Sequence, residues 1–242
     1  MRSTLVLLLP LILFATIGCA TQKSTPSQRA VITGDVLRVR SEPSLKSETL
    51  TSLSRGTIVD VLDKSATTEN IADTEAYWYK IKSENLTGWC FGAFLTTEFE
   101  ESPDKKILTW LMDTKDNYNI IKRAIFLTQQ KKLHIIEYEV MSKQSAFSES
   151  YKYLAVDNGT DVLGTLDFYD VYTGKLLQSA TYPRHDFKWE GEQLKFQNVT
   201  YSGNGCYLWR EDTFNDGKIR KGTLTGKGDS NLIGDQKDPK CH

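Results

Sequence analysis

Apolar and polar residues alternate along much of this chain with a period of two, which is typical of β-strands that bury one face. Between Val36 and Leu95 no helical period of apolar residues is present. Each strand there can bury only one face, so the strands are expected to close on one another as a small barrel or sandwich. The predicted strands are Val36–Arg40, Thr57–Leu62, Trp78–Lys82 and Gly88–Phe91.

From Lys131 onward, the same alternation predicts an antiparallel meander. Turns are indicated at Asp157-Asn158-Gly159, Thr173-Gly174-Lys175 and Glu190-Gly191-Glu192. We therefore predict a mainly-β protein in which a small barrel precedes a second antiparallel β-rich domain, either a meander or a sandwich. The expected strands of that domain are Leu133–Val140, Tyr151–Val156, Thr165–Tyr172, Lys175–Ser179, Asp186–Trp189, Gln193–Phe196 and Cys206–Trp209.

The acidic stretch from Thr96 to Lys105 separates the two regions and contains Pro103, which indicates a linker. A helix cap at Ser102 or Asp104 predicts a short helix from Lys105 to Met112. Ile120 to Leu127 suits a strand or a helix, and the pattern leaves both open. The predicted boundaries are 31–97 for the barrel, 98–104 for the linker, 105–226 for the β-rich domain and 227–242 for a tail.

The N-terminus begins with Arg2 and an apolar run from Leu5 to Phe14, which is typical of a signal-peptide core. The run is too short to span a bilayer, which needs about 20 apolar residues. Four residues, Ala15-Thr16-Ile17-Gly18, then lead directly to Cys19. This arrangement resembles the lipobox of bacterial lipoproteins, in which the cysteine is lipidated and becomes the mature N-terminus. The alternative is an ordinary secretory signal with an incidental cysteine.

Lipid on Cys19 implies a signal peptide over 1–18 and a lipidated, flexible tether over 19–30, where the composition is polar. Each buried methylene of an acyl chain contributes about 0.8 kcal/mol, so several chains hold a protein stably on a membrane. The expected location is the bacterial cell envelope, exported and anchored to a membrane, either periplasmic or surface-facing.

Four stretches resemble, in this order, the bacterial SH3-like domain with its pattern of L-N-V-R-x-G-P-S, L-x-x-G, W-Y-K-V, and G-W-V with a closing Y-L. Relative to this pattern, the segment from Ser65 to Ala76 is expected to form a longer loop before Trp78. The resemblance implies a non-catalytic adaptor that recognises peptidoglycan peptides or other proteins. The stretches are Leu37–Ser44, Leu53–Thr57, Trp78–Ile81, and Gly88-Trp89 followed by Phe94-Leu95.

A peptide-binding face needs exposed aromatic rings and a few polar groups. We assign Trp78 and Trp89 to the barrel core and place the ligand beside the Ser65 to Ala76 loop. The alternative is that the remaining rings also fill the core. The expected ligand-binding residues are Arg40, Glu42, Tyr77, Tyr79 and Phe91.

Tyr151 to Phe196 is similar to one blade of a β-propeller, with its Thr173-Gly174-Lys175 and Trp189-Glu190-Gly191-Glu192 turns. A closed propeller contains about 4 to 8 blades. The chain has room for about one such blade. We therefore expect an open sheet or sandwich built from a single copy of the blade.

The net charge of −1 argues against nucleic acid as a partner, because phosphate binding requires a basic face. Export permits disulfides, and Cys90, Cys206 and Cys241 remain after lipidation of Cys19. We expect a Cys206–Cys241 disulfide, with three free thiols as the alternative.

No metal or cofactor is expected, since the histidines and aspartates match no ligand spacing that we can identify. Ser202 to Cys206, with His185 upstream, faintly resembles the cysteine site of L,D-transpeptidases. However, Asn204 stands where the second His should be and Leu208 where the Arg should be. Without those partners the thiol stays near its free pKa of about 8.5 and is a weak nucleophile.

We therefore expect a protein that is not an enzyme. The main hypothesis is a membrane-anchored lipoprotein that acts as a non-catalytic binding module for peptidoglycan or an envelope protein. The alternatives are a structural or assembly partner of an envelope protein complex, and a degenerate L,D-transpeptidase-like cysteine enzyme.

Overall fold

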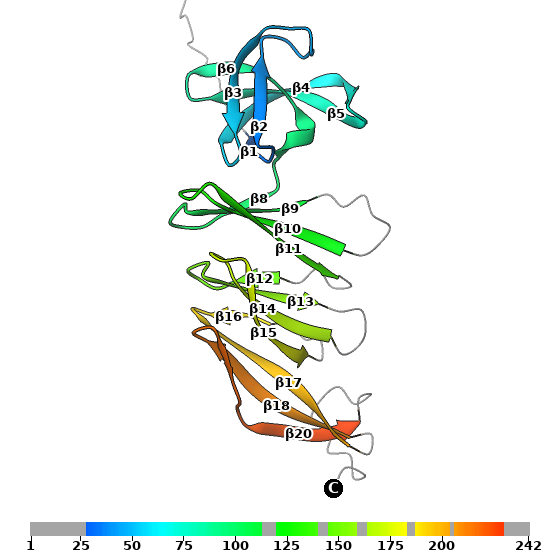
Figure 1. Cartoon of the computed structure of the whole chain (residues 1–242), viewed down its shortest axis with the longest axis vertical. Helices are drawn as coiled ribbons and strands as arrows, with labels where there is room; N and C mark the ends of the chain where they lie inside the picture. The colour runs from blue at the N-terminus through cyan, green and yellow to red at the C-terminus, as the bar shows by residue number, and fades with distance from the viewer. Residues whose placement is uncertain are drawn as a thin grey trace, which may run out of the picture.

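The computed structural model describes residues 28–112, 120–139, 145–158, 164–182, 187–203 and 206–229. These residues form β-strands and one 3-10 helix, η1 (Gly92–Phe94). A curled sheet lies at one end of the molecule, and three further sheets are stacked below it in chain order (Figure 1). The predicted mainly-β, antiparallel fold is confirmed.

The first unit is a seven-stranded antiparallel sheet that curls into a barrel, in the order β3-β2-β6-β5-β4-β1-β7. β1 begins at Gln28, so its first three residues lie in the segment predicted to be a tether. The strand is held in the barrel by Ala30, Val31 and Ile32, which are fully buried. The barrel core consists of Ala30, Ile32, Leu37, Val39, Val59, Ile81 and Cys90. The strands are β1 (Gln28–Ile32), β2 (Val36–Arg40), β3 (Thr49–Ser54), β4 (Ile58–Ile71), β5 (Thr74–Ser83), β6 (Leu86–Phe91) and β7 (Leu95–Thr96).

The expected loop from Ser65 to Ala76 is instead a continuation of β4 and β5 as a hairpin beyond the barrel (Figure 1). The hairpin turns at Ala72 and Asp73, whose φ angles are 49° and 61°. Two successive positive φ angles match the twist of paired strands and make a tight turn. The loop prediction was therefore wrong, since the polar composition of this segment hid a strand exposed to solvent.

The described residues from Phe99 to Asp229 form three antiparallel sheets, in which neighbouring strands follow one another in sequence except for β20. We call them the first, second and third sheets. The first contains β8 (Phe99–Glu101), β9 (Ile107–Met112), β10 (Ile120–Leu127) and β11 (Lys132–Glu139). The second contains β12 (Ser145–Phe147), β13 (Tyr153–Asn158), β14 (Gly164–Asp170) and β15 (Lys175–Tyr182). The third contains β16 (Trp189–Glu190), β17 (Gln193–Gly203), β18 (Cys206–Asn215) and β19 (Lys218–Arg220), with β20 (Leu224–Asp229) also paired to β18.

Three predictions for this region were wrong. The linker over 98–104 contains β8, and the short helix over Lys105 to Met112 is β9. In β9, Ile107 is buried against the second sheet, whereas Leu108 and Trp110 are buried against the barrel. The strand is therefore covered on both faces. The single blade expected over Tyr151 to Phe196 is replaced by three sheets, each a meander of at least four strands.

Side-chain alternation distributes the apolar residues of the inner sheets between two interfaces. In β13, Leu154 and Val156 pack toward the first sheet, whereas Tyr153 and Ala155 pack toward the third. The same rule operates in β10, where Ile125 and Leu127 face the second sheet and Ala124 and Phe126 face the barrel. A run of consecutive buried residues therefore marks a strand between two packed layers.

The first two sheets open with the same hydrogen-bonded turn. Ser102 donates its backbone N–H to the carbonyl of Ile107 over 2.9 Å and accepts the Ile107 N–H on its hydroxyl over 3.0 Å. Ser148 and Tyr153 repeat both bonds at 2.9 and 3.2 Å. This repetition indicates that the two sheets are copies of one structural unit.

The barrel contacts the first sheet through an apolar cluster that includes Val31, Trp110 and Phe126. Gly56 of the L-x-x-G stretch has a φ of +81°, and a Cβ atom built there would lie 2.2 Å from the Phe126 ring. Glycine at this position therefore serves both the turn and the close approach of the two units.

We predict that Gly56→Ala lowers the free energy of unfolding by about 1–3 kcal/mol more than Gly217→Ala, as judged by urea denaturation. Gly217 has a similar φ of +76°, but an added Cβ there would meet no atom closer than 3.8 Å. The control thus shares the backbone strain without the clash. Equal losses in the two variants would contradict a tightly packed contact between the barrel and the first sheet.

Candidate functional site

The outer face of the barrel carries a row of side chains in register across four strands. Arg40 of β2 is paired with Trp89 of β6, and Trp89 is paired with Lys80 of β5. Lys80 is in turn paired with Asp63 of β4. Residues that are directly opposite on neighbouring strands project from the same face of a sheet, so these four form the outer row.

Trp89 is the aromatic centre of this outer row. It follows Gly88 and precedes Cys90, both of which are buried, and its own side chain is only partly buried. The Lys80 ammonium lies 6.0 Å from the centre of the Trp89 ring. A flat ring beside a cation offers contact area to an apolar ligand group and a charge to a carboxylate, and such cation–π contacts contribute about 0.5–1 kcal/mol at exposed sites.

Arg40 is 8% exposed and supports the loop next to the outer row. Its guanidinium donates a 2.7 Å hydrogen bond to the Ser47 carbonyl. The Ser47 hydroxyl lies within hydrogen-bonding distance of the Glu42 and Ser44 carbonyls, at 2.9 and 2.8 Å. Arg40 therefore fixes the loop from Ser41 to Glu48, and the Glu42 side chain is exposed on that loop.

The predicted ligand-binding rings form no exposed cluster around Trp89, although Phe91 projects from the same face of β6. Phe91 is 6% exposed and packs edge-on against Trp78, with ring centres 5.7 Å apart. Tyr79 packs against the barrel core. Tyr77 is partly buried and has the Lys64 ammonium 4.1 Å from its ring centre. Phe91 and Tyr79 are thus structural residues.

The prediction that Trp89 belongs to the barrel core is wrong, because the structure leaves this side chain partly exposed. The period of two contains the correct answer: Cys90 faces inward, so Trp89 must face outward. Trp78 is buried as predicted, at 3% exposure, because the extended hairpin covers it and Glu69 accepts a 2.6 Å hydrogen bond from its indole N–H.

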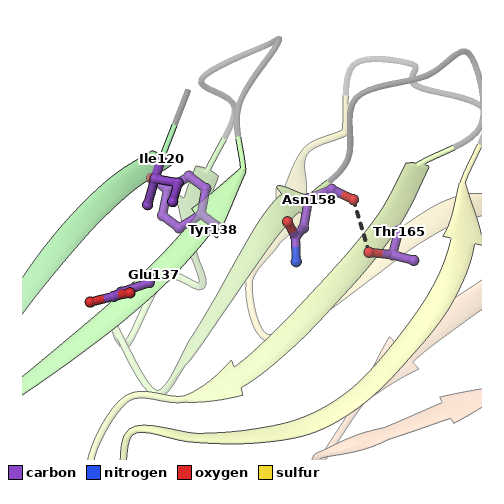
Figure 2. Close-up of a pocket in the computed structure, with 5 residues that line it drawn as sticks. All are labelled: Ile120, Glu137, Tyr138, Asn158 and Thr165. Atoms are coloured by element: carbon purple, nitrogen blue, oxygen red, sulfur yellow. Dashed lines mark hydrogen bonds between the residues drawn. The ribbon is translucent and has the colours of Figure 1, made fainter. Parts of the chain in front are cut away.

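A second feature is a cavity of about 350 Å³ between the first and second sheets, lined by Ile120, Glu137, Tyr138, Asn158 and Thr165. In Figure 2 the Thr165 hydroxyl donates to the Asn158 carbonyl, over 2.9 Å. The Asn158 amide donates to Asp167, and Glu137 pairs with Lys122 at 3.1 Å. These polar groups are engaged with neighbours in their own sheets, so this cavity is a weaker candidate for a binding site than the outer row.

The cysteines have different states. Cys90 is a free thiol that is fully buried, and burial raises its pKa to about 12. Cys206 is disulfide-bonded, so its sulfur is not available as a thiolate. The predicted partner Cys241, the lipidation site Cys19 and the upstream His185 all lie outside the described residues.

The described ranges contain no group of three His, Cys, Asp or Glu side chains that could hold a metal ion. In the same ranges no helix is long and apolar enough to cross a membrane.

Comparison with known families identifies the first unit. Residues 35–96 match the bacterial SH3 domain. The match covers the barrel from the β1–β2 connection to β7, including every member of the outer row. No curated protein matches the chain.

Three solved structures are similar to this chain at low identity. The β-propeller domain of the Trilobed protease from Pyrococcus furiosus is 14% identical, with a TM-score of 0.41 and coverage of 76% of this chain and 57% of that one. The acylaminoacyl peptidase of Pyrococcus horikoshii is 12% identical, with a TM-score of 0.37 and coverage of 68% and 30%. Hsv2 of Kluyveromyces lactis is 9% identical, with a TM-score of 0.29 and coverage of 85% and 84%. The chain spans less than two thirds of the first two, and TM-scores this low say nothing of its activity.

We predict that Cys90 does not react with iodoacetamide at pH 8 in the folded protein and reacts readily in urea. A pKa of about 12 rather than 9.0 leaves about a thousandfold less thiolate, and the side chain has no exposed surface. Mass spectrometry of the peptide that carries Cys90 measures the labelling. Equal labelling rates with and without urea would contradict the buried position.

Proposed function

We propose that this protein is a non-catalytic binding module of the bacterial cell envelope whose SH3 barrel recognises the peptide part of peptidoglycan. The single observation that carries the proposal is the outer row on a barrel that matches the bacterial SH3 domain. A half-buried tryptophan between basic side chains suits a short peptide that carries apolar side chains and carboxylates.

The disulfide at Cys206 supports a non-enzymatic role for the region that faintly resembles a transpeptidase site. Cysteine nucleophiles act as thiolates, and a disulfide removes that form. The charge of the chain, −1 overall, supports a peptide rather than a nucleic acid as the partner of this face.

Sedimentation of chain 20–242 with purified peptidoglycan tests the proposal. We expect the chain to pellet with the sacculi and Trp89→Ala to weaken this binding about tenfold, or about 1.4 kcal/mol, because the ring is the largest contact on the face. The matched control is Leu176→Ala, which removes a side chain that is 51% exposed on the second sheet. A fluorescent label on the N-terminus quantifies the bound fraction.

Two outcomes would contradict the proposal. A chain that stays in the supernatant would exclude peptidoglycan and favour the second candidate, a structural partner of an envelope protein complex. Equal weakening by Trp89→Ala and Leu176→Ala would remove the outer row from the binding face.

We further propose that the protein is lipid-anchored at Cys19. The support is the apolar run from Leu5 to Phe14 and the stretch Ala15-Thr16-Ile17-Gly18 that leads to Cys19. In a bacterial host, Cys19→Ser is expected to move the protein from the membrane fraction to the soluble fraction, because the acyl chains are lost. Immunoblotting of both fractions measures the shift, with Cys90→Ser as the control. A Cys19→Ser protein that stays with the membrane would contradict the anchor.

A further inference from the structure

A polar cavity of about 410 Å³ lies between the second and third sheets. Along β17 and β18 the face toward the second sheet begins with Leu194 opposite Phe214 and continues to Asn198 opposite Arg210. The Phe214 ring stacks on Phe168 of β14, with centres 4.1 Å apart. Beyond this stack the interface changes from apolar to polar, and the cavity lies there. Its lining residues are Gln178, Ser179, Asn198, Arg210, Asp212, Ile219 and Lys221.

Asp212 is the buried carboxylate to which other residues of the cavity are hydrogen-bonded. It has no exposed surface and accepts hydrogen bonds from Asn198 (2.7 Å), Gly222 N (3.0 Å) and the Arg210 guanidinium (2.5 and 2.9 Å). Burial alone would raise its pKa, but the hydrogen bonds from Arg210, Gly222 and Asn198 outweigh burial and lower the pKa. The carboxylate is therefore ionised and fully occupied, and it holds Arg210 in one orientation.

The groups that line the rest of the cavity are mainly donors. Arg210 keeps 22% of its side chain exposed, and Lys221 is exposed at the rim. The Gln178 side-chain carbonyl accepts the Ile219 N–H, which leaves the Gln178 amide nitrogen as its remaining hydrogen-bonding group. Two cations against one carboxylate give the lining a net charge of +1.

From this arrangement we infer that the cavity binds a small organic carboxylate with a polar body, such as a sugar acid. A guanidinium held by a buried carboxylate is preorganised to present its remaining N–H groups to an oxyanion. A net charge of +1 matches a monoanion better than the doubly charged form of phosphate. The amide and hydroxyl groups of Gln178, Ser179 and Asn198 suit hydroxyl groups of the ligand. This site lies outside the SH3 barrel and is independent of the proposed peptidoglycan binding.

Isothermal titration of chain 20–242 with glucuronate, glucose and inorganic phosphate tests the inference. Glucuronate and glucose share one ring and differ by the carboxylate. We expect glucuronate to bind with a dissociation constant in about the millimolar range and glucose not to bind. Lys221→Ala is expected to weaken glucuronate binding about tenfold, because it removes an exposed charge at the rim without disturbing the buried pair.

Lys218→Ala is the matched control, since Lys218 is exposed on β19, three residues before Lys221, but does not line the cavity. Three results would overturn the inference: no heat from glucuronate up to about ten times the expected dissociation constant, equal binding of glucose, or equal weakening by the two lysine variants. Binding of phosphate without glucuronate would also overturn it, because the site would then be a phosphate site.

Discussion

The whole fold depends on the requirement that the first and second sheets of the stack bury apolar side chains on both faces. A four-stranded meander with two apolar faces cannot be stable in water by itself, because each face must be removed from solvent. β13 shows the constraint most clearly: its five residues from Tyr153 to Asp157 are all buried, and they alternate between the two neighbouring sheets. The sheets therefore fold as a stack rather than as separate domains.

The two outer faces of the three-sheet stack, one on the first sheet and one on the third, differ in their surroundings. At the first sheet, the SH3 barrel covers the outer face through Val31 and Phe126. At the third sheet, the outward positions of β17 and β18 first carry the polar pairs Lys195–Thr213 and Gln197–Glu211, and then the buried apolar pair Val199–Trp209. Polar outer faces on terminal units are what keep stacked repeats soluble.

Much of this was readable from the alternation of side chains, and the failures have physical causes. β2 was predicted to the residue, since the buried Leu37 and Val39 alternate with the exposed Val36 and Arg38. β3 was missed because none of its residues is fully buried, so it has no apolar face to detect. The extended part of β4 was taken for a loop because register shifts between Val61 and Asp63 and between Lys64 and Thr68 interrupt the alternation.

The candidate sites were harder to predict than the fold. Trp89 was misplaced because a tryptophan in a short strand suggests a core, although its buried neighbour Cys90 implies the opposite. The Arg210–Asp212 pair could not be predicted, because its surroundings come from β15, β17 and β19, which are distant in sequence. A buried carboxylate is explained only by the partners that surround it, and those partners depend on the stacking of two sheets.

The order of the units along the chain constrains how the protein can act. Only the residues between Cys19 and Gln28 separate the proposed anchor from β1, and an extended chain of that length reaches at most about 30 Å. Under the proposed anchoring, the barrel with its outer row is therefore held close to the membrane, and the stacked sheets lead away from the barrel (Figure 1). Because apolar side chains fill each interface from the barrel to the third sheet, the stack resists bending between its layers. The barrel and the polar cavity between the second and third sheets are thereby kept at a fixed separation.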